Sequence, residues 1–419
     1  MSKCRTWRQL TLPPFLCLLG ACARGPSESE QRAIVTHYVT TAHAVYADSQ
    51  RTAQALEQAV RALAAQPGAD TLDAARSAWR AARLPYAQSE ALRFGHWVVD
   101  EWEGQVNAWP VDEGLLDYVR EPYGAAADNT LARANLVAHD LLNTGALKVD
   151  TREIGTGTLK ALNGLLGQEA NVASGYHAIE FYLWGQDLSA SGPGARPWSD
   201  YAADAHCTRG LERAAARECT KRGAALIAAA QLLVSDLTGM TRQWDAGIRG
   251  SYGARLIHGD PREALRRMLF GMGALAAGEL AGERIQSALL THAQEEEQDC
   301  FSDDTHHSLY YNALGIENFY LGRYGALTGP SVSALLARTN YSLDLRMRTA
   351  LKSTRAALQA VVDAAEQRGL TFDQLITPGN EVGAALLQRA VTALEQEGRV
   401  IEDIGTALGL QPLNPAAGG

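Results

Sequence analysis

The chain has 419 residues, of which 46% are hydrophobic and 20% are charged, with a formal net charge of −9. This length and composition allow one large or two ordinary domains with a sizeable core, and they exclude a chain that is disordered throughout. No basic run or basic stripe with interleaved aromatic residues occurs, so nucleic acid is not expected as a partner.

The N-terminus has the pattern of a bacterial export signal. Three basic residues among the first eight precede an apolar run over 10–20, which is too short to span a bilayer. The run ends in Leu19-Gly20-Ala21-Cys22, which resembles a lipobox. We therefore expect residues 1–21 to be a lipoprotein signal peptide, Cys22 to carry lipid and residues 22–30 to form a tether. A plain secretory signal with a chance cysteine is the alternative. No later stretch is expected to cross a membrane.

Three of the six cysteines lie beyond the signal and its lipidation site, namely Cys207, Cys219 and Cys300. Disulfides persist in the compartments that exported proteins reach. A Cys207–Cys219 disulfide would close a short loop, and a thiolate metal site is the alternative, although no Cys-x-x-Cys supports it. Cys300 is left over.

Apolar residues recur at helical spacing along most of the chain, and strand signals are almost missing. Pro85 is expected to kink or interrupt the second helix, which Thr71 is expected to cap. An irregular, packed loop with a short helix is expected over 104–123. The remaining helices are predicted at 31–65, 129–142, 158–166, from 175 onward, 211–249, 261–279, 342–367 and 379–408. The fold class is therefore all-α.

His177 and Glu180 stand three residues apart in the apolar segment that begins at Gly175. On a helix both project from the same face, one turn apart. An imidazole beside a carboxylate is half of a metal site or an acid–base pair, and it can also be a plain buried hydrogen bond. Burying both groups is costly unless something satisfies them, and a cation does this better than their mutual contact.

The second half of the sequence repeats the plan of the first. When Leu314-Gly315 is set against Trp184-Gly185, His307 falls opposite His177, but Tyr310 takes the place of Glu180. We therefore expect two pseudo-repeated helical-bundle halves, over 31–210 and 211–410, followed by a flexible tail over 411–419. The acidic run over 295–304, just before His306 and His307, is either a solvated loop or a second cation site.

These residues resemble the imelysin family (peptidase M75, which includes iron-regulated protein A), and the likeness runs from about residue 31 onward. The family's hallmark resembles Gly175-x-His177-x-x-Glu180. The other matching residues are Trp79, Arg83, Tyr86, Glu90, Arg93-Phe94-Gly95 and Asn107-Ala108-Trp109-Pro110-Val111-Asp112-Glu113-Gly114-Leu115 in the first half, and Cys300-Phe301-Ser302-Asp303-Asp304-Thr305-His306 and Gly315-Ile316-Glu317-Asn318-x-Tyr320-Leu321-Gly322 in the second.

The resemblance implies a duplicated all-helical lipoprotein in the cell envelope of a Gram-negative bacterium, periplasmic or on the outer membrane. It implies a role in iron acquisition, with iron or an iron-bearing ligand and iron-transport components as partners. His177 and Glu180 are then the core of a metal site, for iron in preference to zinc. Some relatives extend the motif with a Glu where this chain has Leu183. A third ligand must come from elsewhere, with Glu90 the first candidate and Asp112 the second.

Two other functions stay open. A metallopeptidase agrees with the family's peptidase label, but hydrolytic zinc needs three protein ligands, a water position and a general base. No His-Glu-x-x-His occurs, and Glu180 cannot easily be both ligand and base. A structural lipoprotein with a His–Glu pair in its core is the third class. Asp112 and Glu113 can also be carboxylates that complement a helix dipole.

Overall fold

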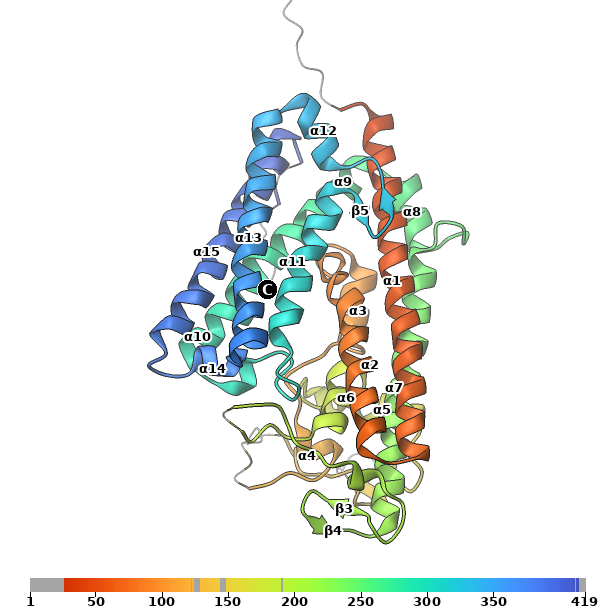
Figure 1. Cartoon of the computed structure of the whole chain (residues 1–419). Coiled ribbons are helices and arrows are strands. Elements are labelled where there is room, and N and C mark those ends of the chain that lie inside the picture. Colours follow the sequence, from red (N-terminus) through yellow and green to blue (C-terminus); the bar gives the residue numbers. More distant parts are fainter. Residues whose placement is uncertain are drawn as a thin grey trace, which may run out of the picture.

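Long helices in two groups make up the fold (Figure 1). The computed structural model describes residues 26–121, 123, 129–143, 148–189, 191–410 and 412–413. In one group, α1 (Glu28–Ala65) packs against α2 (Ala69–Ala87) and α7 (Ala216–Trp244). In the other, α13 (Tyr341–Arg368) pairs with α15 (Glu381–Ala407). Between them lies α11 (Thr305–Leu321), which contacts both α2 and α13.

Shorter elements connect these helices. The α-helices are α3 (Trp97–Glu103), α4 (Glu113–Leu116), α5 (Thr156–Leu162), α6 (Gly175–Trp184), α8 (Tyr252–His258), α9 (Pro261–Gly273), α10 (Ser287–Thr291), α12 (Val332–Thr339) and α14 (Phe372–Ile376). A π-helix, η4 (Ala274–Gln286), continues α9, and the 3₁₀ turns are η1 (Glu90–Leu92), η2 (Leu165–Gly167), η3 (Trp198–Tyr201) and η5 (Gln294–Glu296).

The strands form three isolated antiparallel hairpins. They are β1 (Leu141–Asn143) with β2 (Lys148–Asp150), β3 (Thr208–Arg209) with β4 (Glu212–Arg213), and β5 (Arg323–Tyr324) with β6 (Leu327–Thr328). Each strand is two or three residues long. The predicted all-α class is therefore confirmed. The pseudo-repeat and the division at 210/211 stay predictions, and α7, just beyond that division, packs along α1.

The long helices follow from local sequence and from burial. At the start of α1, Ser27 and Glu30 form a capping box, in which each side chain accepts a hydrogen bond from the other's backbone N–H. The apolar face of α1 is buried from Ile34 to Leu63. Helix α2 begins at Ala69, two residues before the predicted cap Thr71, and it continues through Pro85 to Ala87.

The helix predicted at 129–142 is wrong. The described residues there form turns that lead into β1. The Asn129 side chain accepts the Leu131 N–H, and the Asn135 side chain accepts the Ala138 N–H, with Asn135 at φ +44°. Asparagine side chains that bond nearby backbone groups in this way favour turns over helix. The helix predicted at 211–249 begins only at Ala216, because the β3–β4 hairpin precedes it, and it ends at Trp244.

Helix α7 also corrects the expectation that no later stretch could cross a membrane. By length and composition alone, Ala216–Trp244 is apolar enough to do so, but 56% of its apolar window is buried inside the protein. It packs along α1 and against α6. Packing in the protein core therefore explains the apolar residues of this helix. The signal peptide, Cys22 and most of the tail lie outside the described residues.

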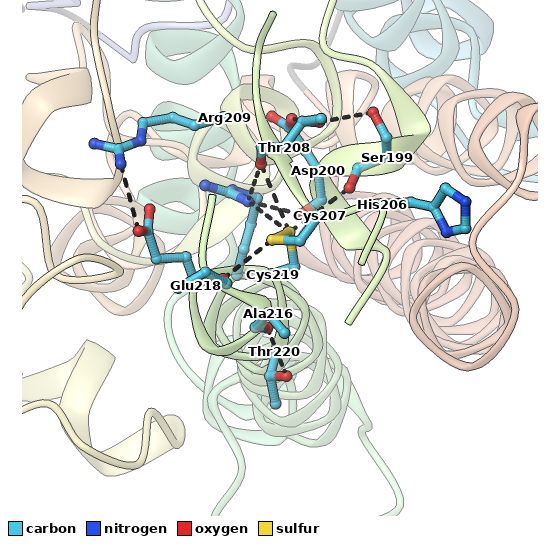
Figure 2. Close-up of a disulfide and its surroundings, with 12 residues drawn as sticks. Ser199, Asp200, His206, Cys207, Thr208, Arg209, Ala216, Glu218, Cys219 and Thr220 are labelled. Atoms are coloured by element: carbon cyan, nitrogen blue, oxygen red, sulfur yellow. Dashed lines mark hydrogen bonds and ion pairs between the residues drawn. A yellow bond between two sulfur atoms is a disulfide. The ribbon is translucent and has the colours of Figure 1, made fainter. Parts of the chain in front are cut away.

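The predicted disulfide between Cys207 and Cys219 is confirmed (Figure 2). It ties the residue before β3 to the first turns of α7. Around it, the Thr208 hydroxyl donates to Asp200 at 2.7 Å, and Arg209 pairs with Glu218 at 3.4 Å. Cys300 is unpaired and partly buried.

Candidate metal centre

Gly175 lets α6 begin against the loop that follows α3. Its φ is +83°, and a Cβ at this position would lie 2.5 Å from the carbonyl carbon and oxygen of Val106. The next N–H, of Tyr176, donates to the Val106 carbonyl at 2.8 Å. Only glycine combines this backbone conformation with so close an approach. The contact brings α6 next to Asn107, and every residue of α6 is buried.

His177 and Glu180 face each other on α6, as their spacing predicts. The distance from His177 Nδ1 to Glu180 Oε2 is 3.0 Å, and the two side chains are 1% and 0% exposed. The other carboxylate oxygen of Glu180 accepts the N–H of Ser302 at 2.9 Å and its hydroxyl at 2.7 Å. Ser302 therefore holds Glu180 so that Oε2 points to the imidazole.

Asp299, in the segment before α11, completes a set of three. Its Oδ1 lies 3.7 Å from His177 Nδ1, and its side chain is fully buried. One ligand atom each from His177, Glu180 and Asp299 lie within 4.8 Å of one another. Neither oxygen of Asp299 has an aligned hydrogen-bond donor, although the Arg83 guanidinium forms an ion pair with Oδ1 at 2.9 Å.

The hydrogen bonds of Asn107 determine the tautomer of His177. Asn107 Nδ2 donates to Glu103 at 3.1 Å and to Glu90 at 3.3 Å, so its Oδ1 faces the other way. That oxygen accepts from Arg83 at 2.7 Å and lies 3.2 Å from His177 Nε2. Because Oδ1 can only accept, Nε2 must carry the proton. His177 Nδ1 therefore presents a lone pair toward Glu180 and Asp299.

Burial decides the protonation of the pair. Desolvation, with the charges of Arg83 and Arg284 adding to it, holds the pKa of His177 well below its usual value. Desolvation and the charge of Asp299 raise the pKa of Glu180 well above its usual value, against the hydrogen bonds from Ser302. These two directions favour a neutral imidazole and a protonated Glu180, whose proton would lie between Oε2 and Nδ1. A metal ion would replace that proton.

The three side chains fit a transition-metal ion. One imidazole nitrogen and two carboxylate oxygens suit iron and zinc. Ligand atoms about 2.1 Å from a shared ion lie at most about 4.2 Å apart. The distances from His177 Nδ1 to Glu180 and Asp299, 3.0 and 3.7 Å, are both within that limit. Ionised Glu180 and Asp299 would carry two negative charges against the one guanidinium of Arg83, so a cation also compensates charge.

The two residues predicted as further ligands lie elsewhere. Glu90 forms an ion pair with Arg284 at 2.9 Å and reaches His177 only through Asn107. Asp112 is the N-cap residue of α4, and its carboxylate accepts hydrogen bonds from Tyr123 and Asn129. In the structure, Asp299 occupies the position beside His177 for which Glu90 was the first candidate.

Most of the acidic run before α11 is not a solvated loop. Glu295 is exposed and Glu296 is partly buried, but from Glu297 to Asp304 the side chains are buried, apart from partly buried Cys300. His307, which aligns with His177, pairs with Asp304 at 3.0 Å and Glu366 at 3.1 Å. His307 therefore does not form a second site of the kind that His177 and Glu180 form.

Sequence reasoning missed Asp299 and the positioning roles of Asn107, Arg83 and Ser302. Asp299 is 119 positions from Glu180, so no spacing rule joins them. The available signal was its place in the acidic run, directly before the Cys300–His306 segment that resembles the family.

Comparisons with known proteins identify the family of this chain. The sequence matches the family model described as imelysin (Peptidase_M75) over residues 42–401. Iron-regulated protein A from Synechococcus elongatus is 36% identical over 75 residues, which are 18% of this chain and 21% of that protein. This chain thus matches about a fifth of the length of that curated relative.

Two crystal structures establish the fold. A protein described as an iron-regulated protein A precursor from Parabacteroides distasonis superposes with a TM-score of 0.65 at 18% identity, over 91% of this chain and 97% of that one. An imelysin-like protein from Psychrobacter arcticum superposes with a TM-score of 0.60 at 16% identity, over 92% and 97%. With the family match over most of its length, this chain belongs to the imelysin family.

Proposed function

We propose that this protein is an exported, lipid-anchored component of iron acquisition that holds an iron ion at His177, Glu180 and Asp299. The observation that carries the proposal is the lone pair of His177 Nδ1 facing two buried carboxyl groups. Such a group of acceptors needs a proton or a cation at its centre. Its partners would be iron or an iron-bearing ligand, and iron-transport components of the envelope.

Three further features support export and an iron-related role. The lipobox-like Leu19-Gly20-Ala21-Cys22 would place Cys22 at the mature N-terminus, on the membrane of a Gram-negative envelope. The Cys207–Cys219 disulfide is typical of an oxidising compartment. The relative from Synechococcus elongatus is named an iron-regulated protein.

Burial favours a binding role over a peptidase. His177, Glu180 and Asp299 are each at most 1% exposed, so the backbone of a polypeptide substrate has no access to them as they stand. A hydrolytic metal also needs an open position for water and a separate general base. If Glu180 binds the ion, the site offers no assigned base.

Metal content tests the proposal. The purified mature chain, incubated with Fe(II) and freed of excess ion by gel filtration, should retain about one iron per chain by inductively coupled plasma mass spectrometry. His177→Ala and Asp299→Asn should retain almost none while their circular dichroism spectra stay helical. The control His206→Ala removes an exposed histidine whose ring contacts only Asp204 among described residues, and it should behave as wild type. Equal iron in His177→Ala and wild type would refute the proposal.

A further inference from the structure

A second group of acidic side chains lies outside the His177 centre. Glu297 and Asp303 come from the segment before α11, and Asp373 comes from α14. One carboxylate oxygen from each lie within 4.8 Å of one another. Glu297 is 1% exposed and Asp303 is 4% exposed, whereas Asp373 is partly buried. The three side chains thus connect the buried segment before α11 with α14, next to the helix group of α13 and α15.

The buried oxygens of this group lack partners. Among the described residues, neither oxygen of Glu297 nor of Asp303 has a well-aligned hydrogen-bond donor, and the Thr305 hydroxyl lies close enough to Glu297 to oppose the rise that burial causes in its carboxyl pKa. Within the described part of the chain, none of the three carboxylates forms a salt bridge, and the guanidinium of Arg80 pairs with Asp304 at 3.4 Å. Buried carboxylates are normally paired or bound to a metal. Glu297 and Asp303 each bring one such oxygen to within 4.8 Å of the Asp373 carboxylate, an arrangement that a bound cation would satisfy.

The neighbouring His306 and His307 make a weaker candidate. Asp304, His306 and His307 also bring ligand atoms together. However, both ring nitrogens of His307 already have carboxylate partners, and Asp304 pairs with Arg80. Among the described residues, one oxygen of Asp304 and one ring nitrogen of His306 also lack partners, compared with all four carboxylate oxygens of Glu297 and Asp303.

We propose that Glu297, Asp303 and Asp373 bind a calcium ion. The set contains only oxygen donors, which hard cations prefer. Oxygens that bind Ca²⁺ at 2.3–2.6 Å can stand up to about 5 Å apart, whereas those that bind Mg²⁺ at 2.0–2.1 Å reach only about 4.2 Å. The three oxygens all lie within 4.8 Å of one another, a span that the ligands of one Ca²⁺ can have. Carboxylates of the protein alone bind Ca²⁺ more readily than Mg²⁺, which usually keeps several waters.

The position of this site gives the ion a structural role. The segment from Glu297 to Asp303 also carries Asp299 and Ser302, both of which belong to the His177 centre. Asp373 lies on α14, which packs against α15. A calcium ion would fasten this segment to the C-terminal helices and thereby hold Asp299 in place. The calcium proposal does not rest on the iron proposal, because it uses different side chains.

Calcium titration of the full mature chain tests the proposal. Isothermal titration after chelator treatment should give about one Ca²⁺ per chain, and 1 mM Ca²⁺ should raise Tm by several degrees. Asp373→Asn, which changes a partly exposed side chain and should fold, is expected to weaken binding at least tenfold, and Glu297→Gln should do the same. The control Asp70→Asn, in the exposed first turn of α2, should bind as wild type.

The His177→Ala variant separates the two sites. It should lose iron and keep the calcium response. Absence of calcium binding in the wild type, or unchanged binding in both Asp373→Asn and Glu297→Gln, would overturn the calcium site without touching the iron proposal. If His177→Ala lost the calcium response and Asp373→Asn kept it, calcium would be binding at the His177 centre. The proposed calcium site would then be wrong.

Discussion

To bind at this centre, a metal ion must displace a single proton that lies between His177 and Glu180. The neutral imidazole donates from Nε2 to Asn107, so its free lone pair at Nδ1 is met by the protonated carboxyl of Glu180 at 3.0 Å. The raised pKa of Glu180 favours retention of this proton. Protonation of this centre and metal binding are therefore competing reactions.

Iron affinity should consequently increase with pH. Glu180 must lose its proton on binding, and its pKa lies above the usual value, so the apparent affinity should rise as the pH is raised from 6 to 8. The His177 pKa is lowered, so histidine protonation contributes little in this range. Titrations in buffers of different ionisation enthalpy should show release of about one proton per ion. Affinity that is independent of pH, with no proton released, would contradict this protonation scheme.

Asn107 is a positioning residue that acts through the imidazole. Its Oδ1 fixes the Nε2–H tautomer, and such partners of metal-binding histidines affect affinity by about 10–100-fold. We expect Asn107→Ala to weaken iron binding by that factor in a competitive chelator assay. The matched control is Asn163→Ala, because Asn163 bonds the backbone of Gly104 and Ala173. Equal affinity in the two variants would show that Asn107 does not orient the site.

At the scale of one helix, Gly175 determines where α6 starts. An alanine Cβ would collide with the Val106 carbonyl at 2.5 Å, at a φ of +83°. We expect Gly175→Ala to lower the free energy of unfolding by at least about 2 kcal/mol. The strain of a left-handed backbone conformation at alanine and the collision with Val106 both destabilise the folded state. Gly239→Ala, at an exposed position of α7 where an added Cβ has nothing within 4 Å, should instead stabilise by about 0.5–1 kcal/mol. Urea unfolding of both variants measures the contrast, and similar effects would contradict this explanation of Gly175.

Elements whose signal is local could be predicted from the sequence, and contacts between distant segments could not. The apolar spacing in α1, α13 and α15 gave helices within a few residues of their ends. His177 and Glu180 were found because one helical turn joins them. Asp299 was not, since only the packing of the segment before α11 against α6 brings it there. The wrong helix at 129–142 came from reading apolar spacing without the turn-forming Asn129 and Asn135.

At the scale of the whole molecule, buried acids make the metal-free protein less stable as pH rises. Glu397 of α15 is fully buried, and desolvation raises its pKa to about 8. Its unfolded pKa is near 4.5, so between about pH 5 and 8 the folded chain binds the extra proton. The contribution of Glu397 to the free energy of unfolding is therefore present at low pH and is lost as the pH rises. The loss is at most about 1.4 kcal/mol per pH unit.

Glu397→Gln should remove this part of the pH dependence. The amide keeps the shape without the charge, so the variant should unfold at a higher denaturant concentration than wild type at pH 8 and show a smaller difference at pH 5. Glu395→Gln, on the exposed face of the same helix, provides the control and should follow the wild-type profile. If Glu397→Gln and wild type lose stability in parallel from pH 5 to 8, Glu397 is not the group responsible.

The His177 centre lies where the α1–α2–α7 group meets the segment before α11. Helix α6 packs with α2 and α7, whereas Asp299 and Ser302 come from the segment that leads into α11. An ion shared by His177, Glu180 and Asp299 would therefore fasten that segment to α6 as well as satisfy three buried side chains.

The central claim is that iron binds to His177 Nδ1. Anomalous diffraction at the iron absorption edge, from crystals of the iron-loaded mature chain, tests it most directly. We predict an anomalous peak about 2.1 Å from His177 Nδ1, with a carboxylate oxygen each from Glu180 and Asp299 as further ligands. Iron-loaded crystals with no peak there, and with Glu180 still 3.0 Å from the imidazole, would contradict the claim.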